Sequence, residues 1–358
     1  MTGDWQRICG ALAAVLAIVG AQICIAASPP LPTDASSAEA ALGEAALTTS
    51  PDCGHFGMRS WLRAKIVRES DLANFGLRLD EDWRNQPREK PVVILIHGFN
   101  STLAKNATML APIRAAQIPC GTFAYPNDHD ISTSAQLLAC ELHRFSKLYP
   151  DRRVILLCHS MGGMVARACV ENPSTDPGNV VRLIMIAPPS HGTVLAHFAV
   201  GSDLWEHWLA RKSGGPWQRT RDSIIDGLGE AADELCPNSD FLTELNGRPR
   251  NPRVKYSILL GTGALMSEPQ LAWIRQSVCD GLARLPGSDG SVEKLDAILN
   301  DIDELVDGKG DGVVAVKRGR LENVSDTLIL PFGHLAVTGE PRDDVLRRVE
   351  QAVLVRVQ

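Results

Sequence analysis

The sequence predicts an α/β fold in which a mostly parallel central sheet is flanked by helices and covered by a helical cap insertion. Two observations support this class. Unbroken apolar runs, typical of strands buried on both faces, recur at residues 91–96, 154–158 and 180–187. Stretches with helical spacing of apolar residues lie between them. Such alternation favours right-handed crossovers and places ligands at the carboxyl edge of the sheet.

The individual elements follow from apolar periodicity and from the turn residues that end each run. Residues 61–82 are expected to add a helix and edge elements. The pattern predicts strands at 91–96, 120–125, 153–158, 180–187, 253–261 and 326–331, and helices at 103–117, 134–149, 161–170 and 341–355.

The composition is that of an ordinary globular protein. The chain has 358 residues, of which 44% are hydrophobic and 22% charged, with a formal net charge of −6. One large domain with insertions, residues 53–358, fits this length. No basic run interleaved with aromatic residues occurs, so nucleic acid is not expected as a partner.

The amino-terminal segment has the order of a secretory signal. Arg7 precedes the uncharged residues 8–21, and small residues lead to a polar break after Ala26 and Ala27. Residues 1–27 are therefore predicted to be a cleaved signal peptide, with an uncleaved membrane anchor as the alternative. Residues 28–52, rich in Pro, Ala, Ser and Thr, are predicted to be a flexible linker. The folded part is expected outside the cytoplasm, secreted or periplasmic, or tethered to a membrane.

The nine cysteines leave seven outside the predicted signal, an odd number that requires at least one free or intermolecular thiol. Cys158 and Cys169 are interpreted as small core residues. Cys236 and Cys279, both in predicted insertions, are the candidate disulfide, with other pairings left open.

Ser160 is the candidate nucleophile. It stands between a buried strand and a helix, where a sharp turn exposes the hydroxyl above the sheet. Gly162 supplies the small residue that close strand–helix packing needs, while Cys158 replaces the first glycine of the Gly-x-Ser-x-Gly pattern. The alternative is an ordinary serine cap at a helix start.

The run at 91–96 ends in His97-Gly98-Phe99, the form of an oxyanion loop. The amide of Phe99, together with that of Met161, is predicted to hold the negative oxygen of a tetrahedral intermediate. His97 is expected to order the loop rather than to act as a base. The alternative is a simple turn at the end of a strand.

An acid and a base follow in the last third of the chain. Asp311 lies between two glycines that allow a tight loop to present its carboxylate, with Asp307 and Asp303 as rivals and a turn aspartate as the alternative. The spacing of the acidic residues here does not match an EF-hand loop. His334 follows the last predicted strand and is the candidate base, against a surface or core histidine.

Two insertions interrupt the alternation. Residues 194–247 are predicted to form the helical cap, whose Trp205 and Trp208, with Trp217, either hold an acyl chain or a bilayer surface or form the core of the cap. Residues 262–309 form a second insertion with an acidic helix at 292–306, expected to be a solvated face. The residues assigned to substrate binding are His97, Gly98, His159, Trp205 and Trp208.

At these motifs the sequence resembles the lipase-type α/β-hydrolases, in the branch of bacterial triacylglycerol lipases and GPI inositol-deacylase-like proteins. The order Ser160, Asp311, His334 is that of this fold and not of chymotrypsin or subtilisin. The further motifs that carry the resemblance are His97-Gly98-Phe99, residues 159–163, 188–193 and 241–246, and Gly310-Asp311-Gly312-Val313-Val314.

The resemblance implies hydrolysis of carboxylic esters of lipid-like or other apolar acyl substrates through an acyl-enzyme on Ser160. It implies a lipid or ester small molecule as partner, with association at a membrane surface, and no metal or organic cofactor. An acyltransferase or a phospholipid or amide hydrolase would use the same residues. A tethered, non-catalytic binding protein is the alternative from a different class.

Overall fold

The computed structural model describes residues 75–98, 107–126, 130–196, 231–264, 266–284, 289–338 and 343–358. Within them, one sheet has the strand order β1-β3-β2-β4-β5-β6-β7. The strands are β1 (Gly76–Leu79), β2 (Val92–Ile96), β3 (Cys120–Ala124), β4 (Val154–His159), β5 (Val180–Ile186), β6 (Lys255–Gly261) and β7 (Thr327–Leu330). β1 pairs with β3 antiparallel, and every other pair of neighbours is parallel.

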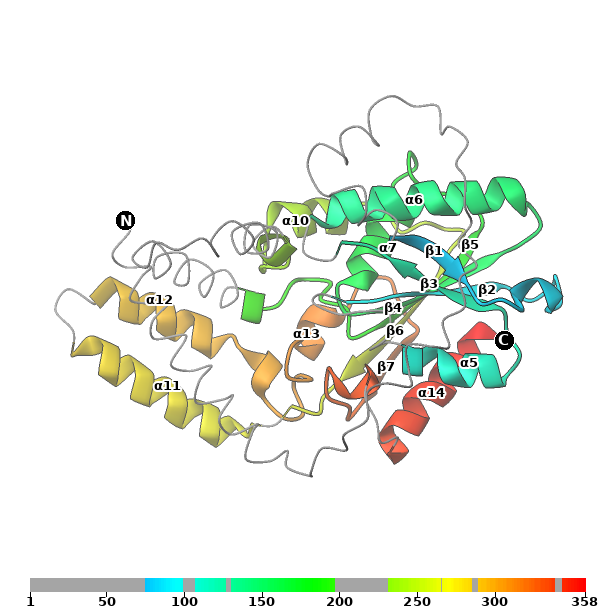
Figure 1. Ribbon diagram of the computed structural model, residues 1–358. Coiled ribbons are helices and arrows are strands. Elements are labelled where there is room, and N and C mark those ends of the chain that lie inside the picture. The colour runs from blue at the N-terminus through cyan, green and yellow to red at the C-terminus, as the bar shows by residue number, and fades with distance from the viewer. Residues whose placement is uncertain are drawn as a thin grey trace, which may run out of the picture.

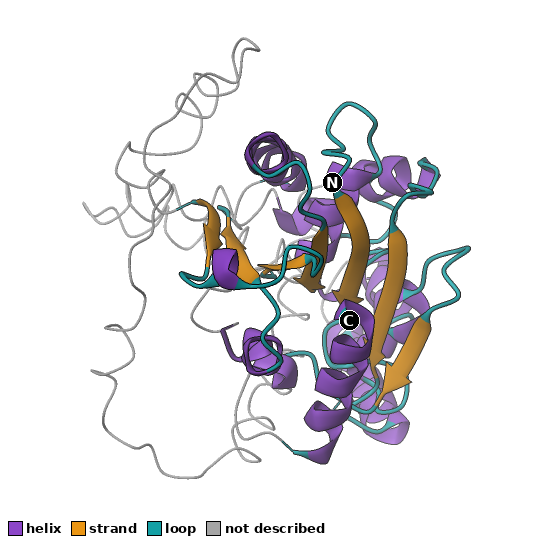
Figure 2. Cartoon of the chain, turned by 90° about the vertical axis from the view of Figure 1, so that its right-hand side faces the viewer, coloured by secondary structure: helices purple, strands orange, loops and turns teal. Residues whose placement is uncertain are grey.

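The central strands are apolar throughout because helices cover both faces of the sheet. All residues of β2 and β4 are buried, and Ile96 of β2 stands opposite Cys158 of β4, which stands opposite Met185 of β5. Figure 2 shows the sheet with helices on both sides. This register brings the carboxyl ends of the three strands to one edge.

Two helical layers enclose the sheet. Figure 1 shows α6 (Ile131–Leu148), α7 (Gly162–Val170) and α10 (Asp240–Gly247) over one face, and α5 (Ala111–Ala115) and α14 (Asp344–Val357) over the other. Each face has its own hydrophobic cluster, one including the inner sides of α6 and α7 and the other those of α5 and α14. The short elements are η2 (Trp83–Asn85), η3 (Ala107–Leu110), η4 (Asp303–Leu305), α13 (Val316–Gly319) and η5 (Ala336–Thr338).

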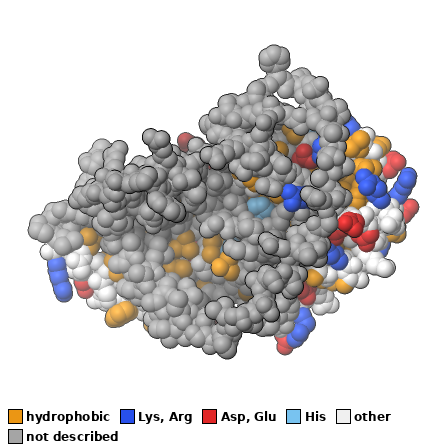
Figure 3. Space-filling model, viewed as in Figure 1, with side chains coloured by type: hydrophobic (Ala, Val, Ile, Leu, Met, Phe, Trp, Pro, Cys, Tyr) orange, Lys and Arg blue, Asp and Glu red, His pale blue; other side chains and the backbone are white. Residues whose placement is uncertain are grey.

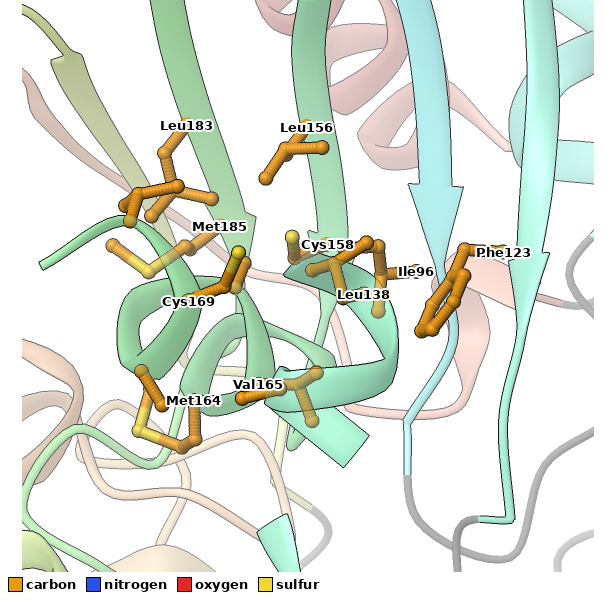
Figure 4. Close-up of a cluster of buried hydrophobic side chains, with 14 of the residues drawn as sticks. Ile96, Phe123, Leu138, Leu156, Cys158, Met164, Val165, Cys169, Leu183 and Met185 are labelled. Carbon is orange, nitrogen blue, oxygen red and sulfur yellow. The ribbon is translucent and has the colours of Figure 1, made fainter. Parts of the chain in front are cut away.

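Cys158 and Cys169 lie in the first of these clusters, between β4 and α7 (Figure 4). Both are fully buried and free, as predicted for small core residues. The predicted disulfide between Cys236 and Cys279 is wrong, because both thiols are free. Cys236 follows the short helical turn at 231–234, whereas Cys279 lies on α11 (Glu268–Ala283), where its thiol contacts Asp296 at 3.8 Å.

The second insertion is a helical hairpin of α11 and α12 (Asp289–Asn300), which lies to one side of the sheet in Figure 1. The acidic helix ends at Asn300 rather than at 306. It is not simply a solvated face, since Leu295 and Leu299 are buried against α11 and help to form a separate small core. Trp273 of α11 is 64% exposed.

Several predicted features lie outside the described residues: the signal peptide, the linker, Phe99, Trp205, Trp208 and Trp217. In the part of the chain that the structure describes, no helix is both long and apolar enough to cross a membrane. Figure 3 shows the described residues mainly at the margin of the molecule, where acidic and basic side chains are interspersed.

Candidate active site

Ser160 occupies a strained turn between β4 and α7. Its φ is +53°, a left-handed conformation that residues other than glycine seldom adopt. The Ser160 amide donates to the carbonyl of Ile186 at 2.9 Å, which ties the turn to β5. Helix α7 begins two residues later, at Gly162. The local structure is therefore the strand, sharp turn and helix that a nucleophilic serine requires.

Gly162 lets this turn lie against the end of β2. A Cβ at Gly162 would come within 2.6 Å of the carbonyl oxygens of both Ile96 and His97. Cys158, at the position where the usual pattern has glycine, instead buries its thiol completely in the core on the α7 side. The second glycine of the pattern is thus needed sterically, and the first is replaced without disturbing the turn.

The loop after β2 passes close to Ser160. A Cβ on Gly98 would lie 2.9 Å from the Cβ of Ser160, so only glycine lets the backbone pass this close. The His97 carbonyl accepts a hydrogen bond from the Tyr125 hydroxyl at 2.6 Å, and the two rings stack with centroids 4.4 Å apart. Burial lowers the pKa of His97. His97 therefore has the contacts of a residue that orders the loop.

Met161 is buried and αR at the start of α7. Its amide is among the first N–H groups of the helix, which have no partner inside the helix and favour negative charge. Phe99, the other predicted oxyanion donor, lies outside the described residues.

Asp311 and His334 form a buried hydrogen-bonded pair. Asp311 Oδ2 and His334 Nδ1 are 2.9 Å apart, and the side chains are 1% and 6% exposed. Asp311 Oδ1 accepts the amides of Val313 and Val314 at 2.9 and 2.7 Å. With Nδ1 bonded to a carboxylate, the Nε2 of His334 is left as the proton acceptor.

The rival acids lie elsewhere. Asp303 forms ion pairs with Lys309 and Lys317 at 3.9 and 2.9 Å, and Asp307 is exposed. Of the three candidate acids, the one bonded to His334 is thus Asp311.

Gly261, at the end of β6, lets the loops that carry Asp311 and His334 pack closely against this strand. A Cβ there would come within 2.7 Å of the Asp311 Cβ and 2.5 Å of the Phe332 carbonyl. The loop that carries Asp311 and the loop that carries His334 therefore both pack against the end of β6. Sequence reasoning did not single out Gly261, although a glycine that ends a buried strand is a signal for such close approach.

His159, which directly precedes Ser160, contacts the residue that is the candidate base, His334. Its Nε2 lies 3.0 Å from the His334 carbonyl oxygen, and the ring centroids are 4.8 Å apart. The pKa of His159 is lowered to about 3, mainly by burial and to a smaller extent by the neighbouring His334. Among the described residues the Ser160 hydroxyl has no hydrogen bond to His334, a contact that commonly tightens only around substrate.

Glu304 is a second residue that the sequence did not reveal. It was placed in a solvated helix, yet it is 0% exposed. Its carboxylate accepts the amide of Val194 at 3.0 Å, and its carbonyl accepts that of Gly312 at 2.8 Å. Burial raises the pKa of Glu304. Glu304 thereby connects Val194, the first residue of the predicted cap, with the loop that carries Asp311.

Metal-ligating side chains do not gather in this region. In the described segments, no group of three or more His, Cys, Asp or Glu residues is arranged to hold a metal ion.

Comparison with solved structures settles the fold. The mature form of the Bacillus licheniformis lipase BlEst2 superposes with a TM-score of 0.51 at 18% identity, covering 78% of this chain and 97% of that one. Its propeptide form gives a TM-score of 0.52 at 20% identity, covering 78% and 53%. The chain has the α/β-hydrolase fold. The predicted fold class is therefore confirmed.

A family model supports the same assignment. Residues 127–212 of this chain match the PGAP1-like alpha/beta domain, a stretch that contains α6, β4, the Ser160 turn, α7 and β5. The predicted resemblance to this group of proteins is confirmed. A search of the curated proteins finds none that matches the chain.

Proposed function

We propose that this α/β-hydrolase cleaves carboxylic esters of lipid-like or other apolar acyl groups through an acyl-enzyme on Ser160. The observation that carries the proposal is the buried Asp311–His334 pair, 2.9 Å between Oδ2 and Nδ1, next to a serine held at a φ of +53°. A serine, an acid and a base in this fold order have the roles needed for acyl transfer.

The proposed steps use only groups of the chain. His334 Nε2 takes the proton of Ser160 as its oxygen attacks the acyl carbonyl, and Asp311 stabilises the imidazolium that forms. The amides of Phe99 and Met161 hold the oxyanion, a contribution of about 3 kcal/mol for each such donor. The imidazolium then protonates the leaving alcohol. Water activated by the same histidine releases the acid and frees Ser160. The proposal needs no metal or organic cofactor.

An apolar acyl substrate is supported by what surrounds the base. Leu335, directly after His334, is 73% exposed. The similar solved structures are described as a lipase. We assign Trp205 and Trp208 of the cap, with His97 and Gly98 of the loop, to substrate binding. Association with a membrane surface and export directed by residues 1–27 belong to the same proposal.

The same constellation also serves acyl transfer to an alcohol, and hydrolysis of phospholipids or amides. These reactions differ in the leaving group or in the acceptor and not in the triad. They are therefore separated by product analysis with glycerol or a fatty alcohol present.

The test is hydrolysis of p-nitrophenyl esters from acetate to palmitate, with Ser160→Ala and His334→Ala as matched variants. Loss of turnover by orders of magnitude in both variants, with the parent active, supports the triad, and the chain-length profile separates esterase from lipase. A fluorophosphonate probe that labels the parent and not Ser160→Ala gives a substrate-independent readout. A parent that neither turns over an ester nor takes the probe would favour a non-catalytic binding protein.

A further inference from the structure

The residue before the proposed nucleophile is bonded directly to the residue that carries the proposed base. His159 and His334 are 175 positions apart in the sequence, and the His159 Nε2 lies 3.0 Å from the His334 carbonyl oxygen. The two rings also pack, with centroids 4.8 Å apart and planes at 43°. This contact joins the end of β4 to the loop after β7 through a single hydrogen bond.

The partner of Nε2 fixes the tautomer of His159. A carbonyl oxygen only accepts, so Nε2 carries the proton and Nδ1 has a lone pair. Nδ1 is buried and has no hydrogen-bond partner among the described residues. The nearby Gly98 is so close that a Cβ on it would lie 3.5 Å from this nitrogen. A second proton would place a cation in a buried site beside two other histidines, and the ring therefore stays neutral.

His334 is held from two sides. Its amide donates to the Asp311 carbonyl at 2.8 Å and its ring bonds the Asp311 carboxylate, so the acid loop fixes one side. The His159 bond to its carbonyl fixes the other side from the nucleophile turn. The position of the base relative to Ser160 is thus set by the residue covalently attached to that serine.

We propose that His159 is a positioning residue, which holds the His334 carbonyl so that the base stays within reach of Ser160. The inference rests on the proposed acyl transfer and departs from the sequence-based expectation of a substrate contact. His159 acts through His334 and does not touch the substrate. A positioning role predicts an effect on kcat, whereas a substrate contact predicts an effect on KM.

The test compares His159→Gln, whose amide nitrogen can still donate, with His159→Leu, which cannot. The Leu variant is expected to lose about 10- to 100-fold in kcat, because a misplacement of about 1 Å has that size of effect, with KM changed less than about twofold. The Gln variant is expected to keep kcat within about fivefold. In the Leu variant, the rate at which the fluorophosphonate probe labels Ser160 should fall together with kcat. His143→Gln and His143→Leu on α6 are matched controls, with thermal melting to check folding.

A second readout does not depend on activity. In the full chain labelled with ¹⁵N-histidine, His159, assigned by its loss in the Gln variant, should show a single protonated nitrogen and no titration between pH 5 and 8. Titration in that range, equal impairment of the Gln and Leu variants, unchanged kcat in the Leu variant, or an effect confined to KM would each overturn the inference. Absence of Ser160 labelling in the parent would instead remove the proposed function, and this role with it.

Discussion

Tyr125 donates its phenolic proton to the carbonyl of His97 at 2.6 Å, and its ring lies almost parallel to the imidazole, at 13°. Tyr125 directly follows β3, so the strand next to β2 supports the backbone of the loop that passes Ser160. The hydroxyl is buried, with the residue 2% exposed. The loop geometry therefore depends on a polar contact from outside the motif that predicted it.

Removal of this hydroxyl should affect both stability and activity. Tyr125→Phe leaves a buried carbonyl with one partner fewer, which costs about 1–3 kcal/mol in the free energy of unfolding. The loop should also be less well placed, with lower kcat on p-nitrophenyl butyrate. Urea unfolding and initial rates measure the two effects. Tyr149→Phe, whose hydroxyl accepts from exposed Arg84, is the control and should change little.

Asp311→Asn should lower kcat by about 10³- to 10⁴-fold, because an amide in place of the carboxylate no longer fixes the tautomer and charge of His334. Asp307→Asn, at an exposed position, should retain the parent rate. Steady-state kinetics on one ester compare the two. A full rate in Asp311→Asn would move the acid to another residue.

Gly162→Ala should abolish the proposed ester hydrolysis or prevent folding, since its Cβ would come within 2.6 Å of two backbone carbonyl oxygens. Gly281→Ala is the matched control. It lies within α11, nothing lies within 4 Å of its added Cβ, and it should stabilise the helix by up to about 1 kcal/mol. Thermal melting and activity of the two variants test the pair, and a native-like Gly162→Ala would show that the turn is not tightly packed.

Arg167 of α7 and Glu171, which directly follows this helix, form an ion pair whose side chains are both 0% exposed, and Arg250 contacts the same carboxylate. Glu171→Gln leaves a buried guanidinium without its counter-charge, which should reduce the free energy of unfolding by about 3–5 kcal/mol. Glu244→Gln breaks the more exposed pair with Arg248 and should cost less than about 1 kcal/mol. Denaturant titrations of the two variants provide the comparison, and equal losses would contradict the effect of burial.

The neutral state of His159 should make stability depend on pH. Its pKa is about 3 in the folded chain against 6.5 for an ordinary histidine, so below pH 6.5 the unfolded chain binds a proton that the folded chain does not. Stability therefore falls as pH falls, by about 1.4 kcal/mol for each unit between these two values. From pH 7 to pH 5 the parent should lose about 2 kcal/mol more than His159→Gln. Urea titrations at both pH values give this difference, and equal losses would show that His159 protonates in the folded state.

The sheet could be predicted from the sequence because burial on both faces leaves a continuous apolar run. The expected strand at 91–96 is β2 (Val92–Ile96), and that at 180–187 is β5 (Val180–Ile186). Helix bounds were less accurate. The helix expected at 103–117 is described only as η3 and α5, where Pro112 stands in the first turn of α5.

The contacts that place the candidate site could not be predicted in the same way. Ser160 and His334 were found from local patterns, whereas the His159 bond to His334 and the anchoring by Glu304 join segments far apart in the chain. Motif spacing along the sequence predicts neither of these two contacts. The same limit explains the false pairing of Cys236 with Cys279, which was based on location in insertions and not on distance.

The strand order also bears on the order in which the protein can become active. β4 and β5 pair across 26 positions, Val154 with Val180, whereas β7 pairs with β6 across 69 positions, Ile258 with Thr327, after the chain has passed through the whole α11–α12 hairpin. Pairings across long sequence separations form slowly. A folding intermediate with β4 and β5 in place would hold the Ser160 turn, whose amide bonds Ile186 of β5, without His334. Reactivity would then appear as the last step of folding, when β7 docks and brings His334 to the turn.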